Sequence, residues 1–252
     1  MTNLYRANLK LSLKRKESFI LWVFALLPFI LIIVDLFDTQ FMQLSAPANS
    51  LSFTTFLEAV INVQYETFLP LVALIYLVIV TVGDEVRSGK LLLYKDINRA
   101  EIIFAKLFSL LTVYGIYFGL TVVTSLLTYY THLVNQPYTS GQFFPSEGQE
   151  FKNSILIVLA TIAMSVICIF LTAFLSLKFN KGLTLLLVSI VMLFSFVSSK
   201  LTLTSYIFPN AYPEFFTGSN FWLVLLAILG NLVGISFILS WCNQASFKKI
   251  EY

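Results

Sequence analysis

The sequence predicts an all-α integral membrane protein, and three observations lead to this fold class. First, 58% of the 252 residues are hydrophobic and only 12% are charged, whereas soluble domains carry about 25% charged residues. Second, long apolar runs recur along the chain, and a helix needs about 20 mostly apolar residues to cross a bilayer. Third, the basic residues gather in a few segments between these runs, which is typical of cytoplasmic loops.

Six apolar segments are candidates for transmembrane helices. They are residues 18–37, 66–83, 104–131, 152–177, 183–199 and 220–241. They predict a transmembrane domain over residues 18–241, preceded by residues 1–17 and followed by a cytoplasmic tail over residues 242–252. Residues 38–62 and 132–151 are expected to form outer loops, and the prolines and glycines of the second are typical of irregular structure.

The distribution of basic residues predicts the orientation of the chain. Six spans place both termini on one side, and fourteen of the sixteen lysines and arginines then fall on that side, with Lys152 and Lys200 as the exceptions. The positive-inside rule therefore predicts a multi-pass protein with both termini in the cytoplasm. The small positive net charge is then a feature of membrane topology, and we expect no nucleic-acid partner.

The N-terminal segment, residues 1–17, has the pattern of an amphipathic helix that lies in the membrane interface. Arg6, Lys10 and Lys14 recur at every fourth position and form one basic stripe. Such a stripe favours contact with the anionic headgroups of the inner leaflet. An alternative is that these residues are only a charged flank that orients the first span.

Residues 200–219 combine two prolines with a group of aromatic side chains. The aromatic residues are Tyr206, Phe208, Tyr212, Phe215 and Phe216. Aromatic rings favour the boundary between lipid and water. We therefore expect an outer re-entrant segment of short, broken helices, which is tolerated where protein covers its backbone.

Two spans contain glycines four residues apart. Gly115 and Gly119 lie in the third span, and Gly230 and Gly234 lie in the sixth. Small residues at this spacing flatten one face of a helix and let another helix approach closely. They predict tight packing between helices and indicate no particular partner.

The residues needed for catalysis or for metal and cofactor binding are absent from the sequence pattern. The single histidine, His132, falls in an outer loop, and Gly89-Lys90-Leu91 lacks the Ser or Thr of a phosphate-binding loop. Asp35 and Glu66 lie near the outer ends of the first two spans, where a topological role is favoured over contact with a substrate. We therefore expect no enzymatic activity in this chain, and any energy for its work must come from another protein.

Residues 84–106, between the second and third spans, hold nine charged side chains in an otherwise apolar region. Five are basic and four are acidic, and the apolar residues 91–93 lie among them. This mixture favours specific pairing with a protein over simple adhesion to lipid. The segment is predicted to form a cytoplasmic coupling helix that docks on a cytosolic partner, with a solvated, topology-setting loop as the alternative.

The order of residues in this segment resembles the signature after the second span of type-2 ATP-binding-cassette (ABC-2) permeases. Glu85, Gly89, Arg99 and Lys106 occupy matching positions. The chain differs from the family pattern at Lys90, where the family has threonine, and at residues 96–98, where the family has a proline before the arginine. The plan of the whole chain, from the basic N-terminal helix to the aromatic segment before the last span, is also similar.

The resemblance implies a partner and a set of coupling residues. The coupling helix of the family sits on a separate ATPase subunit that binds ATP and Mg²⁺, and two permeases pair as a homodimer or a heterodimer. The resemblance implies coupling roles for Glu85, Gly89, Arg99 and Lys106, and the apolar run and the charges between them add Leu92 and Asp96 as predicted coupling residues. The resemblance also implies a location in the bacterial cell membrane.

The apolar, Phe-rich spans predict a hydrophobic or amphipathic cargo, which we expect to be a peptide. The size and composition resemble permeases of low-GC Gram-positive bacteria that export, or confer immunity to, amphipathic antimicrobial peptides such as phenol-soluble modulins. Two alternatives stay open. One is a non-transporting immunity or assembly factor, and the other is an ion-coupled secondary carrier.

Overall fold

The computed structural model describes residues 2–37, 47–88, 98–198, 200–201 and 204–248. These residues form an all-α bundle, and the one β-type pairing among them is an isolated bridge between Leu51 and Thr139. The fold class predicted from the sequence is confirmed in this respect.

The helices follow the chain in a simple order. The first group is α1 (Thr2–Leu13), α2 (Lys16–Phe24), α3 (Phe29–Leu36), α4 (Phe53–Glu66), α5 (Leu69–Val78), the π-helix η1 (Ile79–Gly83) and α6 (Asp84–Arg87). The second group is α7 (Arg99–Thr131), the 3₁₀-helix η3 (Leu133–Asn135), α8 (Gly148–Ser176), α9 (Lys181–Ser198), the 3₁₀-helix η4 (Pro209–Phe215) and α10 (Phe221–Lys248).

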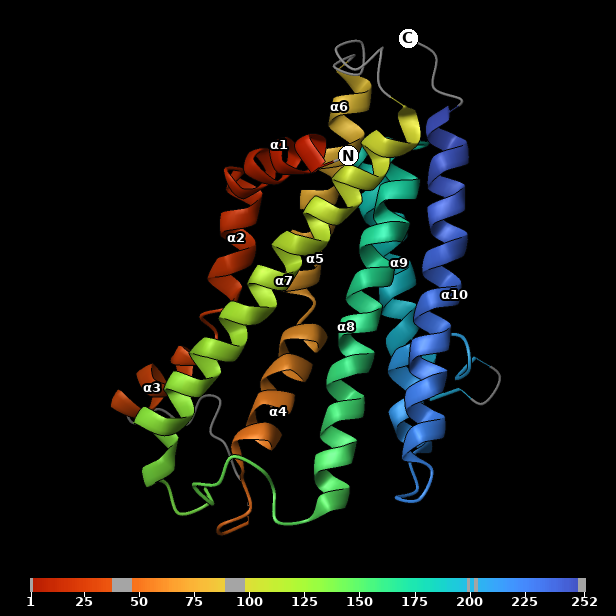
Figure 1. Ribbon diagram of the computed structural model, residues 1–252. Helices are drawn as coiled ribbons and strands as arrows, with labels where there is room; N and C mark the ends of the chain where they lie inside the picture. The colour runs from red at the N-terminus through yellow and green to blue at the C-terminus, as the bar shows by residue number, and fades with distance from the viewer. Residues whose placement is uncertain (1, 38–46, 89–97, 199, 202–203, 249–252) are drawn as a thin grey trace.

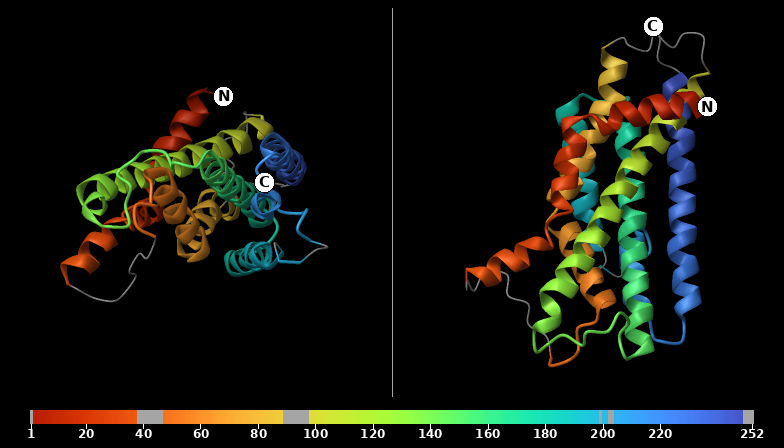
Figure 2. Two further views of the ribbon diagram at one scale, coloured as in Figure 1. Left: turned by 90° about the horizontal axis from the view of Figure 1, so that it is seen from below. Right: turned by 60° about the vertical axis from the view of Figure 1, so that its left-hand side comes forward.

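The path of the chain runs up and down the long axis of the bundle (Figure 1). Helix α1 lies across one end, which we call the α1 end, and α10 finishes at this same end (Figures 1 and 2). Helices α7 and α9 run away from the α1 end, whereas α8 and α10 return to it. Helices α4 and α5 together make one further pass.

Five helical segments among the described residues are long and apolar enough to cross a membrane. They are Leu69–Arg87, Arg99–Asn135, Gly148–Ser176, Lys181–Ser198 and Phe221–Phe247. They match five of the six predicted spans within a few residues, except that the last helix continues into the segment predicted to be a tail. The remaining predicted span, residues 18–37, is not one helix.

The predicted first span is divided because Pro28 interrupts it. Proline has no N–H to continue the helix, and the amides of Ala25, Leu26 and Leu27 instead bond three residues back, at 3.0–3.2 Å. Helix α2 therefore ends at Phe24, and α3 leaves the bundle at a steep angle (Figure 2).

The second predicted span begins earlier than expected, because part of the predicted outer loop over residues 38–62 is helical. Helix α4 contributes a first half to this pass, and α5 continues it above a break (Figure 1). At the break, Phe68 has a left-handed backbone with φ of 63°, and Pro70 stands at the start of α5. The second pass is thus a discontinuous helix rather than a single straight one.

The core centres on α5 and η1, which other helices surround. Leu74, Ile75, Leu77, Val78 and Ile79 are all at most 2% exposed. A helix that is apolar on every side belongs in the interior of a bundle. At the other extreme, only 11% of the apolar window of α10 is buried in this chain.

The aromatic segment between α9 and α10 folds back onto the bundle. Pro209 and Ala211 of η4 are buried, and η4 contacts both α8 and α10. Protein therefore covers this segment at Phe208, Pro209 and Ala211, whereas Tyr206, Ile207 and Phe215 are exposed.

Gly83 provides a specific test of the packing between η1 and α8. A Cβ atom at this position would lie 3.1 Å from both the Cβ and the carbonyl oxygen of Ser176. We expect Gly83→Val to lower the free energy of unfolding in detergent by about 1–3 kcal/mol, because overpacked sites force the backbone apart. Gly119→Val is the matched control, since a Cβ there meets no atom of the described chain within 4 Å. Equal losses in the two variants would contradict the close contact.

Candidate functional site

A buried cluster of charged side chains lies at the α1 end of the bundle. Glu85 is 6% exposed and Lys106 is 1% exposed, and the Lys106 ammonium donates to Oε2 of Glu85. Lys106 Nζ also donates to the carbonyl oxygen of Thr81 at 3.0 Å, and Arg15 Nη2 donates to Oε1 of Glu85 at 3.1 Å. The cluster therefore connects the α1–α2 junction, α6 and α7 through one carboxylate.

A second set of contacts holds the opposite side of α6. Arg87 Nη2 donates to the carbonyl oxygens of Ser176 and Phe179, where α8 ends. Lys181, the first residue of α9, pairs with Asp84 at 2.7 Å. Charged contacts thus connect this short helix to the ends of four longer ones.

The structure assigns different positions to the predicted coupling residues. Glu85 and Lys106 are buried in the cluster, so their side chains do not form a surface on which a partner could dock. Arg99 is partly exposed at the first position of α7. Three further predicted residues lie outside the described residues, namely Gly89, Leu92 and Asp96. Arg15, which the sequence analysis did not select, is part of the same cluster.

Helix α1 carries an exposed basic face and a polar buried face. The exposed residues are Arg6, Lys10 and Lys14, the last of which follows the helix. The buried residues of α1 are Asn8 and Ser12, and the hydroxyl groups of Tyr5 and Thr112 lie 2.9 Å apart. Helix α1 therefore packs on α7 through its buried face, and its basic side chains lie outside that contact surface.

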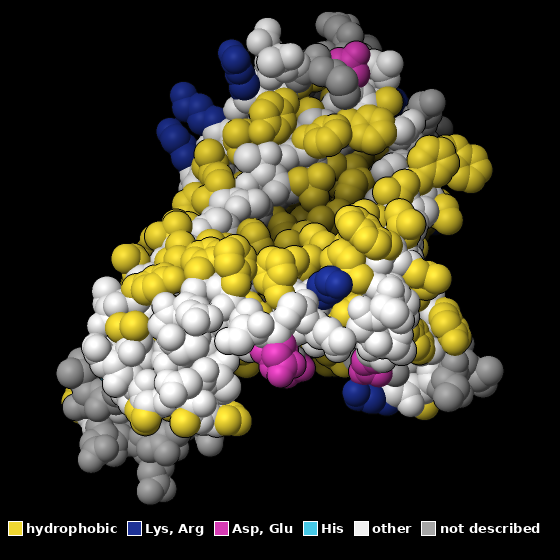
Figure 3. Space-filling view, turned by 60° about the horizontal axis from the view of Figure 1, so that its bottom comes forward, with side chains coloured by type: hydrophobic (Ala, Val, Ile, Leu, Met, Phe, Trp, Pro, Cys, Tyr) yellow, Lys and Arg dark blue, Asp and Glu magenta, His cyan; other side chains and the backbone are white. Residues whose placement is uncertain are grey.

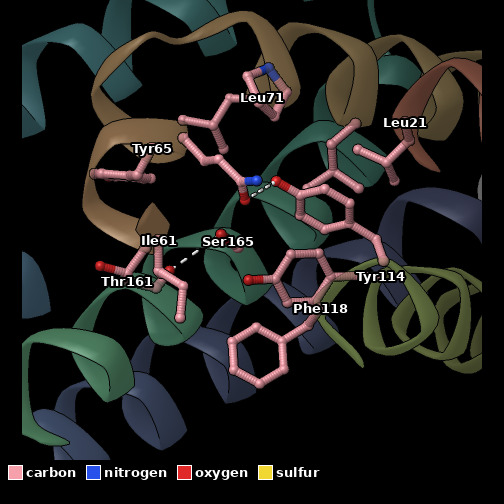
Figure 4. Close-up of a pocket in the computed structure, with 12 residues that line it drawn as sticks. Leu21, Ile61, Tyr65, Leu71, Tyr114, Phe118, Thr161 and Ser165 are labelled. Carbon is pink, nitrogen blue, oxygen red and sulfur yellow. Dashed lines mark hydrogen bonds between the residues drawn. The ribbon is translucent and has the colours of Figure 1, made fainter. Parts of the chain in front are cut away.

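A small cavity with a mostly apolar lining lies where the broken helices meet. Its volume is about 30 Å³, which is enough for a water molecule. The residues that surround it include Leu21, Ile61, Tyr65, Leu71, Tyr114, Phe118, Thr161 and Ser165 (Figure 4).

The surface of the bundle is hollowed on the face where α7 and α8 lie in front in Figure 1. Hydrophobic side chains line this hollow (Figure 3).

Gln64 of α4 organises the wall of this cavity. Its amide nitrogen donates to the carbonyl oxygen of Phe24 at 3.0 Å, and its amide oxygen accepts from the Tyr117 hydroxyl at 2.7 Å. Thr124 similarly donates to the carbonyl oxygen of Ala25 at 2.6 Å. Two carbonyl oxygens beside the break at Pro28 thus receive donors from side chains of α4 and α7, and that of Phe24 also accepts from the Leu27 amide.

A much larger cavity, which we call the vestibule, lies between α4, α8, α9 and η4. Its volume is about 620 Å³. Its polar lining includes Asn62, Glu66, Asn153, Lys200, Asn210 and Glu214. Lys200 pairs with Glu214 at 2.7 Å, and Asn62 donates to Glu66 at 3.1 Å. The hydrogen bond to Glu214 raises the pKa of Lys200, and the charge of Glu66 adds a smaller increase.

Two buried residues line both cavities. Tyr65 of α4 and Thr161 of α8 belong to the lining of the small cavity and of the vestibule. Tyr65 is 5% exposed, and its hydroxyl lies 3.3 Å from that of Ser195 in α9. A single layer of side chains therefore separates the vestibule from the interior of the bundle.

The glycine pairs do not mediate helix packing within the chain. Gly115, Gly119, Gly230 and Gly234 are exposed, and a Cβ added at any of them would meet no atom of the described chain within 4 Å. The prediction of tight packing is therefore wrong for contacts inside this chain. The flat faces of α7 and α10 point outward.

Comparison with models of known protein families, with curated proteins and with solved structures finds no match for this chain. The fold itself defines the class. Among the described residues, five long apolar helices make this a multi-pass membrane protein, with a buried charge cluster at the α1 end and with the small cavity and the vestibule within the bundle.

The charge cluster generates a stability prediction. We expect Lys106→Met to lower the free energy of unfolding by about 3 kcal/mol, because removing one partner of a buried ion pair leaves an incompletely compensated charge. Adding Glu85→Gln to this variant should cost little more, since it removes that charge. Denaturant unfolding in detergent measures both effects. Glu214→Gln, which breaks the exposed pair with Lys200, is the control and should leave stability almost unchanged.

Gln64 generates a second stability prediction. We expect Gln64→Leu to destabilise the protein by about 1–3 kcal/mol, because the buried Tyr117 hydroxyl loses its acceptor, while the Phe24 carbonyl loses one of its two donors. Asn62→Leu, two residues earlier in α4, is the control because Asn62 bonds only to the exposed Glu66. If both variants unfold at the same denaturant concentration, the role assigned to Gln64 is wrong.

Proposed function

We propose that this chain is the permease subunit of an ATP-binding-cassette exporter, with a separate cytosolic ATPase as its source of energy. In this proposal the α1 end faces the cytoplasm, and the bundle forms a path for a hydrophobic or amphipathic cargo. Residues 84–106 are the segment on which the ATPase acts. The cargo is a peptide, and the location is the bacterial cell membrane.

The observation that carries the proposal is the anchoring of α6. This helix projects from the α1 end of the bundle (Figure 1), and its charged residues contact the α1–α2 junction, α7 and the turn between α8 and α9. A push on the segment that follows α6 would act on all of these elements together. Buried ion pairs suit such a role because they fix one geometry.

The interior of the bundle supports a path for cargo. The first and second passes are broken, and the small cavity lies beside these breaks. Discontinuous helices next to cavities are the usual construction of membrane transport sites. The π-helix between α5 and α6 adds a third irregular segment, and such segments occur often at functional positions.

The outer surfaces of the bundle support contacts with lipid and with a second permease. The exposed cations Arg6 and Lys10 of α1 suit an anionic inner leaflet. The exposed glycines of α7 and α10 offer flat faces to another helix. Either face would accommodate an identical or a related subunit.

Purification from the native membrane tests the proposal. We expect an ATPase subunit to co-elute with the wild-type chain, and Arg99→Glu to reduce its recovery by at least tenfold, since a reversed charge at the start of α7 would repel the surface that the arginine meets. Lys152→Glu makes the same charge change in the first turns of α8 and serves as the control.

Three results would contradict the proposal. They are the absence of any co-eluting ATPase, which would favour a non-transporting membrane protein, equal recovery with Arg99→Glu and with wild type, and labelling of Ser88→Cys from outside the cell. A variant without Cys168 and Cys242 provides the background for the labelling experiment.

A further inference from the structure

The geometry points to the vestibule as a binding site for the ammonium-bearing end of an amphipathic peptide. This inference rests on the proposed function, because it names the class of cargo and the place where the cargo binds. The argument proceeds from the size of the vestibule, its charge, one unpartnered acceptor and its apolar wall.

The vestibule has the size of a ligand site. Its volume of about 620 Å³ falls inside the range of roughly 300–1,000 Å³ that is typical of small-molecule sites. Four elements that are distant in sequence form its walls, so the cavity is a product of the tertiary fold. It is large enough for one end of a peptide and too small for a folded protein.

The formal charge of the vestibule is negative. Lys200 neutralises Glu214 at 2.7 Å, whereas Glu66 accepts a hydrogen bond from the uncharged amide of Asn62. Among the described residues, no lysine or arginine forms an ion pair with Glu66. Lys200 lies near enough for its pKa to be affected by Glu66, but its closest partner is Glu214. One carboxylate is therefore left to attract a cation.

An unpartnered acceptor adds to this excess. The amide nitrogen of Asn210 donates to the carbonyl oxygen of Ser195 at 3.0 Å, which fixes the orientation of the side chain. Its oxygen is buried and has no hydrogen-bond partner in the part of the chain that the structure describes. A buried acceptor without a donor is costly. An N–H group of a ligand would supply the missing donor, and an ammonium in the same cavity would neutralise Glu66.

The remaining wall is apolar and favours an amphipathic ligand. Ile157 and Ala160 of α8, Phe196 of α9 and Pro213 of η4 line it. The polar rim and the apolar wall thus face one space, and a peptide with both ammonium and aliphatic groups matches both. The mouth lies toward the end of the bundle opposite α1, where α8 begins and α9 ends, so the peptide occupies the vestibule from that side.

Equilibrium binding to the purified chain in nanodiscs tests this inference without any ATPase. The probe is a fluorescent synthetic helix of leucine and lysine with a free N-terminus, and the comparison peptide has an acetylated N-terminus and glutamine in place of lysine. We expect Glu66→Gln to weaken binding of the cationic peptide by about tenfold, as the loss of one charge-assisted hydrogen bond predicts. Asn153→Asp, which adds a carboxylate to the lining, should strengthen it several-fold.

Glu150→Gln is the matched control, because Glu150 is exposed and does not line the vestibule. Equal binding of the two peptides, or equal affinities in the Glu66→Gln and Glu150→Gln variants, would overturn the inference. Displacement of the peptide when phosphatidylethanolamine replaces phosphatidylcholine in the nanodiscs would assign the site to a lipid amine and would also overturn it. Binding that persists without a co-eluting ATPase would leave this site intact and refute only the exporter.

Discussion

The structure depends on one constraint, which is that hydrocarbon offers no hydrogen-bond partner to an exposed backbone group. Pro28 lies between α2 and α3, and it has no amide to offer the carbonyl of Phe24, four residues earlier. Gln64 and Thr124 supply donors to the carbonyls of Phe24 and Ala25. These bonds join α2, α4 and α7, so the chemistry that satisfies the breaks also brings three passes together. The small cavity is the space that remains where the three meet.

The same principle governs the charged end of the bundle. Glu85 and Lys106 lie inside the protein, where an unpaired charge would be far more costly than at the surface. Their pairing, together with Arg15, requires that the α1–α2 junction, α6 and α7 keep one arrangement. The high density of charged side chains at this end therefore has two origins. Some of these side chains form ion pairs inside the protein, and others remain at the surface. A rigid connection of this kind is what a segment moved by another protein would need.

Much of the fold follows from composition and periodicity. Five of the six predicted spans correspond to long helices, because runs such as residues 152–177 contain no residue that interrupts a helix. The sequence shows Pro28 and Pro70, but it does not show whether each proline bends its helix or divides it. That outcome depends on hydrogen-bond donors supplied by distant residues such as Gln64.

The candidate site was harder to predict than the fold. Ionisable groups inside the spans do not mark it, whereas Tyr117, Thr121, Thr124 and Thr128 form a polar stripe at helical spacing on α7. This stripe is a sequence signal for the small cavity. The sequence contains no such signal for the vestibule, because its walls form only when η4 packs against α8.

Helix α10 contributes a different consequence. Trp222 and Trp241, which lie close to opposite ends of this helix, are 72% and 70% exposed, and tryptophan rings anchor at the two surfaces of a bilayer. Only 11% of the apolar window of α10 is buried in this chain, although the helix packs along α8, so the distance between these two rings sets the membrane thickness to which the helix is matched. A thinner bilayer would tilt α10, because a helix longer than the hydrocarbon thickness is accommodated by tilting. Lipid chain length therefore becomes a physical variable to which this protein responds through its last helix.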